Sequence, residues 1–220
     1  MATAARTKAA RKSPTATTKA RTAASASSRI ERDPVLGFDD AAAWNAWLAE
    51  NHATSTGLWL KLRKKAKGAS ALTYAEAVDE ALVYGWIDGQ KRAFDDAAWL
   101  QRFSPRGARS IWSKINRDKA DALIASGRMM PAGLAQVERA RGDGRLDAAY
   151  DGAKNMSVPE DLEAALAKNA RAKAFFATLD SANRYAVLFR IHNVKRAETR
   201  ARKIETFVAM LAKHEKIHGG

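Results

Sequence analysis

The chain has 220 residues, 46% of them hydrophobic, with 38 Lys or Arg against 24 Asp or Glu and a formal net charge of +14. This length fits one globular domain or two small ones, and the charge favours anionic partners over cationic ones. Cysteine is absent, which excludes disulfides, thiolate metal sites and cysteine nucleophiles.

Hydropathy points to a soluble protein. No apolar run reaches the roughly 18 residues of a membrane-spanning helix, and no secretory signal is recognisable. We therefore expect a cytoplasmic protein without a membrane span.

Residues 1–30 consist mainly of Ala, Thr, Ser, Lys and Arg, with seven basic side chains, no acid and no aromatic residue. Such a composition cannot bury enough apolar surface to fold, so it predicts a disordered basic tail. A solvated tail, an arm that binds polyanions and a targeting signal are all compatible with it. The remaining residues hold 31 bases against 24 acids, so the body of the chain is also positive.

The segment 31–150 contains all six tryptophans and predicts an α+β subdomain with a small antiparallel sheet. Its first helix is capped by Asp39 or Asp40 and ends near Asn51, and a second helix opens with a capping box at Thr73 and Glu76. The expected strands are Leu58–Arg63, then Trp86–Asp95 and Ala98–Phe103 as a hairpin.

After Pro105 the pattern is helical to the end of the chain, which makes the fold class α+β but mostly helical. We expect a boundary near residues 147–157, giving a tail 1–30, a subdomain 31–150, a helical module 151–214 and a short C-terminal tail 215–220. Six helices are expected in this part. The first is capped by Ser110 and reaches Ser126, the second runs from Pro131 to Gly142, and the third is opened by Ser157, Pro159 and Glu160. The fourth lies around Phe175 and Phe176. The fifth is capped by Asp180 or Ser181 and ends at His192 on the edge of the core, and the sixth runs from Ala197 to Leu211.

The candidate ligand-binding residues fall into two groups. Arginines close to a helix start suit phosphate or carboxylate, because guanidinium groups and free helix amides both bind anions. Asp88 would orient Arg102 or Arg106, or act as a general base if it is buried. The alternative is that the tryptophans are core and the arginines are solvated or ion-paired, and that Glu198 pairs with Arg202. The candidates are Trp86, Asp88, Lys91, Arg102, Arg106, Trp112 and Asn116, followed by Lys195, Glu198 and Arg200.

Signatures of catalysis are weak. None of the four histidines makes a metal-ligand pair with a neighbouring acid, and His214 with His218 lies where the last helix frays. The common sequence motifs of nucleotide-binding proteins, zinc proteases and serine hydrolases are absent. We expect no metal and no cofactor, and the sequence favours a non-enzymatic protein, with an enzyme that uses a pocket around Asp88 as one alternative.

Several segments carry distinctive strings. These are EALVYGWIDGQ at Glu80–Gln90, RFSPR at Arg102–Arg106, SIWSKIN at Ser110–Asn116, GRMMPAGL at Gly127–Leu134 and ETRARKI at Glu198–Ile204, with Val158, Pro159, Phe175, Arg184, Tyr185, Ile191 and Lys195. Together they resemble the YdeI/OmpD-associated family, also called bacteriocin-protection proteins. The resemblance covers Val35 to about His214, and the chain departs from it at Val83, Leu146 and Val194.

The resemblance implies a role in tolerance of antimicrobial peptides and bacteriocins, and association with an outer-membrane porin, without an established reaction. Because those peptides are often cationic, a chain of net charge +14 would repel them at long range. We therefore expect a binding or stress-tolerance module whose partner is an anionic ligand or an acidic protein surface. The other alternative is non-specific nucleic-acid binding through residues 1–30 and the basic stretch from Lys61 to Lys67.

Overall fold

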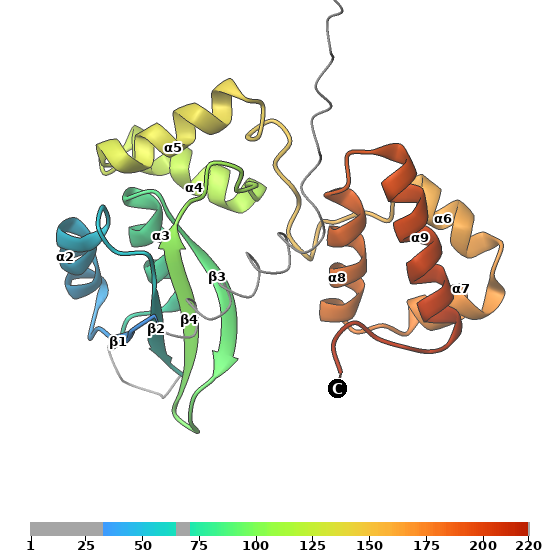
Figure 1. Ribbon diagram of the computed structural model, residues 1–220. Coiled ribbons are helices and arrows are strands. Elements are labelled where there is room, and N and C mark those ends of the chain that lie inside the picture. The colour runs from blue at the N-terminus through green and yellow to red at the C-terminus, as the bar shows by residue number, and fades with distance from the viewer. Residues whose placement is uncertain (1–32, 65–70, 220) are drawn as a thin grey trace, which may run out of the picture. The chain divides into compact units, whose positions relative to one another are not determined.

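The computed structural model of the protein describes residues 33–64 and 71–219 (Figure 1). The predicted basic tail, residues 1–30, lies outside this part. The chain divides into two compact units, residues 1–106 and 107–220. The described residues form eight helices and four strands, so the predicted α+β, mostly helical class is confirmed. The boundary expected near residues 147–157 stays a prediction.

Unit 1 is built on a four-stranded sheet with the order β1-β2-β4-β3. Strands β2 (Leu58–Arg63), β4 (Ala98–Pro105) and β3 (Trp86–Ala93) are antiparallel, as predicted. Strand β1 (Val35–Gly37) was not predicted and pairs parallel to β2, so the sheet is mixed. Three residues are too few to show an alternating pattern, and their partner lies more than twenty residues further along the chain.

One face of the sheet packs against two helices. Residues directly opposite each other share a face, and Leu58 opposes Phe103 on β4. The Phe103 ring lies 5.7 Å from that of Trp44 in helix α2 (Ala41–Asn51). The Trp44 indole donates a 3.1 Å hydrogen bond to the carbonyl of Ala77 in helix α3 (Tyr74–Val83). This tryptophan therefore joins the sheet to both helices.

The local signals for these elements are confirmed. Asp40 caps α2 by accepting from the Ala43 amide at 2.8 Å. The capping box of Thr73 and Glu76 forms at the start of α3. The hairpin turns at Asp95, whose carboxylate accepts from the amides of the two residues that lead into β4.

Strand β3 is an edge strand with a bulge. The register shifts between Asp88 and Lys91, and the Gln101 side chain on β4 donates a 2.8 Å hydrogen bond to the Gly89 carbonyl. A bulge twists an edge strand and interrupts the row of backbone groups that another strand would pair with. The edge is thus shaped against strand addition.

Unit 2 begins with helices α4 (Lys114–Ala125) and α5 (Pro131–Gly142). The predicted cap Ser110 is wrong: the Ser113 hydroxyl accepts from the Asn116 amide at 3.1 Å. Ser110 instead lies in a turn, with its amide bonded to the Gly107 carbonyl. Both serines precede helical residues, and Ser113, directly before the helix, has the extended backbone of a capping residue.

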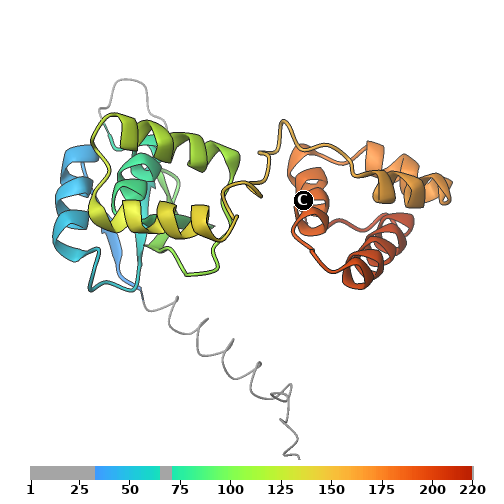
Figure 2. The ribbon, with the colours of Figure 1, turned by 90° about the horizontal axis from the view of Figure 1, so that it is seen from above.

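Four more helices of unit 2, α6 (Glu160–Ala167), α7 (Ala170–Ala177), α8 (Ser181–His192) and α9 (Ala197–Ala212), gather around a common interior (Figures 1 and 2). Asp180 caps α8, as predicted. The buried side chains of this interior are Met156, Leu162, Leu166, Ala172, Phe176, Val187, Leu188, Ile191, Ile204, Phe207 and Leu211.

Two details of this helical part differ from the prediction. Pro159, not Ser157, occupies the cap position of α6, and it makes no side-chain cap bond. The Ser157 carbonyl lies 3.2 Å from the His192 ring nitrogen Nε2. His192 was expected at the edge of the core, but it is exposed at the last position of α8.

Candidate functional site

Two of the predicted site residues are buried in unit 1. Trp86 is 1% exposed, and its indole donates to the His52 carbonyl at 3.2 Å. Arg106 is 5% exposed, and its backbone amide donates to the Gly85 carbonyl at 3.0 Å. Neither side chain is part of a surface that a large ligand would touch.

Arg102 is fixed by a partner that the sequence did not indicate. Its Nε and Nη2 atoms lie 2.9 and 2.7 Å from Oδ2 of Asp33, which is 8% exposed. Nη2 also lies 3.5 Å from the Thr56 carbonyl. The two charged residues are 69 positions apart, so no local spacing could have revealed the pair. The expectation that Asp88 orients Arg102 is wrong.

Asp88 lies on the other face of the sheet from Arg102. Asp88 opposes Phe103, whereas Arg102 opposes Trp59 on β2, and neighbouring residues of one strand point to opposite faces. The half-buried Asp88 carboxylate accepts a 2.7 Å hydrogen bond from the hydroxyl of Tyr74. The sheet therefore keeps the two predicted partners apart.

The exposed cations of unit 1 gather around the β3–β4 hairpin. We call Lys61, Arg63, Lys64, Lys91 and Arg92 the hairpin patch, and all five are exposed. The first three lie at the end of β2, which runs beside β4, and the other two lie on β3. Of the predicted site residues, only Lys91 belongs to this patch.

Aromatic rings support three cations of the hairpin patch. The Lys91 ammonium lies 4.3 Å from the centre of the Trp99 ring, and the Arg92 guanidinium lies 4.2 Å from that of Trp59. The Lys61 ammonium lies 4.6 Å from the ring of Phe94. Such contacts favour a cation over a ring face and limit its side-chain freedom. The patch thus presents positions that are partly fixed before any ligand arrives.

Acidic residues offset only part of this charge. Lys61 lies 3.6 Å from the Asp95 carboxylate, and both side chains are more than 40% exposed. Lys64 donates to the Asp95 backbone carbonyl at 2.9 Å. A solvent-exposed pair of this kind is weak. Lys61 and Arg63 also line a hollow of about 250 Å³. The other residues of its lining are Gly37, Phe38, Asp39, Ala71 and Leu72.

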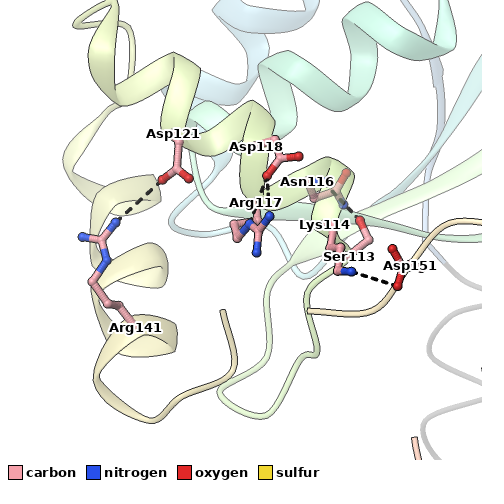
Figure 3. A network of polar contacts seen from close by, with 8 residues as sticks. All are labelled: Ser113, Lys114, Asn116, Arg117, Asp118, Asp121, Arg141 and Asp151. Atoms are coloured by element: carbon pink, nitrogen blue, oxygen red, sulfur yellow. Dashed lines mark hydrogen bonds and ion pairs between the residues drawn. The ribbon is translucent and has the colours of Figure 1, made fainter. Parts of the chain in front are cut away.

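In unit 2, Trp112 is 2% exposed and Asn116 is half-buried in the first turn of α4. The backbone of Tyr150 exchanges hydrogen bonds with the carbonyl of Trp112 and the amide of Lys114, at 3.0 and 2.9 Å. Charged side chains of α4 are paired with acids or bases nearby (Figure 3). These pairs are Lys114 with Asp151 at 2.9 Å, Arg117 with Asp118 at 2.9 Å, and Asp121 with Arg141 at 3.7 Å.

Of the three predicted residues at or near the start of α9, Arg200 links the helices of this part. Arg200 donates from Nε and Nη2 to the two oxygens of Asp161 on α6, at 2.5 and 2.9 Å, and from Nη1 to the Ile191 carbonyl at 2.8 Å. Glu198 lies 3.7 Å from Arg202, which is the alternative that the spacing allowed. Lys195 is exposed. Arg200 is therefore a structural link between α6, α8 and α9.

This link predicts a pH dependence. The hydrogen bond from Arg200 lowers the pKa of Asp161 below its ordinary value. A carboxyl whose folded pKa is depressed stabilises the fold above its unfolded pKa of about 3.9, and that contribution is lost as the pH falls through the folded pKa. Arg200→Gln should cost about 1 to 2 kcal/mol at neutral pH, and the difference from the parent should shrink below about pH 4.

Urea unfolding followed by circular dichroism at several pH values measures this difference. Arg202→Gln removes the same charge from the same helix at a side chain that is 69% exposed, and it should change stability by less than about 0.5 kcal/mol. Equal stability of Arg200→Gln and the parent at neutral pH would contradict the assigned role of the link.

Two kinds of feature are absent from the described ranges 33–64 and 71–219. No three His, Asp or Glu side chains there come together in a way that would hold a metal ion. No helix of that part is both long and apolar enough to cross a membrane.

Comparison with known protein families gives two matches, in different parts of the chain. Residues 36–136 match a family described as a domain of unknown function, DUF8412. Residues 155–214 match the family described as "Bacteriocin-protection, YdeI or OmpD-Associated". No curated protein and no solved structure matches the chain. The predicted resemblance is thus confirmed for the C-terminal helices, and the N-terminal strings fall in the other family. Residues 155–214 of this chain are a domain of the bacteriocin-protection, YdeI or OmpD-associated family.

Proposed function

We propose that this protein is a non-enzymatic binding module of the bacteriocin-protection type, which contributes to antimicrobial-peptide tolerance by binding an anion through the hairpin patch. The observation that carries the proposal is the grouping of five exposed cations on, or directly after, the two strands that flank β4, with three of the cations held over aromatic rings. The family of residues 155–214 supports the type of protein.

The geometry of the hairpin patch favours a ligand with several anionic groups. Lys91 and Arg92 are neighbours on a strand, so their side chains leave opposite faces of the sheet. A ligand that meets both must wrap around the edge strand, as a polyanion or an extended acidic surface does. Arginine and lysine both bind phosphate and carboxylate, and arginine does so with two parallel bonds.

The sign of the charge argues against direct capture of cationic peptides. The chain carries +14, and like charges repel at long range and lower association rates. Tolerance would then work through an anionic target: a phosphate-bearing component of the envelope, or an acidic face of a partner. The words "OmpD-Associated" in the family description fit the second of these.

The test is binding to heparin across a range of salt concentrations. Lys91→Gln/Arg92→Gln should weaken binding about tenfold and reduce the dependence of log affinity on log salt by roughly 1 to 2, because fewer counterions are released. The control Arg202→Gln/Lys213→Gln removes the same charge from two exposed positions, one in α9 and one at its C-terminal cap, and should change affinity by less than about twofold. Equal losses in both variants would mean that only net charge matters, and would overturn the patch.

A second candidate function, binding of single-stranded nucleic acid, has one specific observation in its favour. Phe94 is 49% exposed beside Lys61, and single-strand binders combine cations with aromatic rings on which bases stack. The same experiment separates the two functions when an oligothymidylate replaces heparin. If bases stack on this ring, Phe94→Ala should weaken binding of the oligonucleotide more than binding of heparin. If only the anionic charge is bound, it should weaken binding of both ligands equally.

A further inference from the structure

A second hollow lies in unit 2, on helix α8, and has the composition of a small-ligand site. It measures about 400 Å³ and is lined by Ala182, Tyr185, Ala186, Phe189, Arg190 and His218. Its lining is mostly apolar, with one arginine among the side chains. Pockets for small ligands typically measure 300 to 1,000 Å³ and combine apolar walls with a few polar groups.

Aromatic rings form one side of this hollow. The rings of Tyr185 and Phe189 lie 5.5 Å apart, and Tyr150 meets Phe189 edge to face at 4.9 Å. Residues 185 and 189 are four apart and therefore lie on one side of the helix. Together the rings offer a continuous apolar surface to a hydrocarbon chain or to another ring.

The chain beyond α9 contributes His218 to the lining of the hollow and is tied in place. It returns to the start of α8 (Figure 1), where Asn183 is 4% exposed. The Asn183 side chain accepts from the His218 amide at 2.8 Å and donates to the His218 carbonyl at 3.3 Å. A buried amide that satisfies both groups of one residue fixes that segment. The segment that brings His218 to the hollow is thus held by hydrogen bonds.

Arg190 supplies the charge. Its Nη1 donates to the Ala186 carbonyl at 3.0 Å, and among the described residues it has no carboxylate in ion-pair range. An arginine has five N–H donors, so most of them are available to a ligand. A tyrosine hydroxyl is neutral at physiological pH and can donate a hydrogen bond, and burial raises the pKa of the nearby Tyr185 to about 12.

We propose that this hollow binds a small amphipathic anion, meaning one alkyl chain or aromatic ring that carries a single carboxylate or phosphate. The apolar part lies on Tyr185 and Phe189, and the anionic head binds the guanidinium of Arg190. This site and the hairpin patch share no residue, so either proposal can fail without the other.

The test is calorimetric titration of the full chain with octanoate, octyl phosphate and octanol. Binding of at least one anion, with octanol at least about fivefold weaker, is the expected result. Arg190→Gln should weaken binding of the anion about tenfold, because a charge-assisted hydrogen bond is lost. It should leave the affinity for octanol unchanged. The tighter of the two anions identifies the head group.

Two further variants complete the experiment. Arg184→Gln removes the same charge from the same helix, where the guanidinium lies over the Phe176 ring and away from the hollow, and should leave affinity unchanged. Ala182→Trp fills the hollow from an exposed position and should abolish binding even if Arg190→Gln folds poorly. Absence of binding to the parent chain, or equal binding by the parent and Ala182→Trp, overturns the proposal.

Discussion

Trp44→Ala should destabilise unit 1 by about 3 to 5 kcal/mol, the usual cost of removing a large buried aromatic side chain. Trp44 is 0% exposed. Its ring lies 5.7 Å from Phe103 on the sheet and 6.4 Å from Trp86, and its indole bonds to α3. The substitution leaves a cavity where the sheet and both helices of the unit meet, and the surrounding side chains cannot close it without moving the helices.

Tryptophan fluorescence during urea unfolding measures this effect in the intact chain. Five of the six tryptophans lie in unit 1, so the signal reports mainly on that unit. The midpoint should fall by roughly 2 M for a typical urea dependence. Trp47→Ala is the matched control, because the Trp47 ring stacks on Trp44 but is only half-buried, and it should cost less than half as much. A midpoint within about 0.5 M of the parent would contradict the central role of Trp44.

Gly57→Ala should destabilise the same unit by roughly 2 to 4 kcal/mol, from backbone strain and a steric clash together. Gly57 has a φ of +142°, which L side chains rarely adopt. A Cβ atom there would lie 2.8 Å from Nη2 of Arg102, 2.9 Å from the Phe103 carbonyl and 3.2 Å from Oδ2 of Asp33. The backbone oxygen cannot move without distorting β4, and the other two atoms belong to the buried ion pair.

Gly127→Ala separates strain from clash. Gly127 has a φ of +71°, and nothing lies within 4 Å of a Cβ built there, so strain alone should cost about 1 kcal/mol. Gly37→Ala, at an ordinary backbone conformation with its nearest neighbour at 3.8 Å, should be close to neutral. Unfolding in urea measures all three variants. If Gly57→Ala proves no worse than Gly127→Ala, the close approach of the ion pair does not constrain this position.

Much of the secondary structure was predictable because its determinants are local. A capping box such as Thr73 with Glu76 needs only a spacing of three, and a turn such as that at Asp95 needs only the next few amides. Strand β1 was missed because its three residues are specified by their partner β2 and not by their own pattern. The cap of α4 was misplaced because two nearby serines offer the same local chemistry.

The site was less predictable because exposure and pairing depend on topology. Arg102 and Arg106 look alike in the sequence, yet one pairs with Asp33 and the other lies inside unit 1. Arg200 was a candidate ligand residue, and Asp161 on another helix holds it. Lys91 was among the candidates, but the pairing of the strands decided which other cations lie near it.

The charges of the bulged edge strand β3 have a consequence for self-association. Lys91 and Arg92 are exposed on a strand that has one side without a neighbour in the sheet, and positive charge at such an edge discourages a second copy from extending the sheet. An anion that neutralises these two side chains removes that repulsion. The bulge then remains to oppose pairing of a second strand with this edge. Ligand binding and resistance to aggregation are therefore coupled at this strand. The protein with a bound anion depends more on the bulge to prevent strand addition than the free protein does.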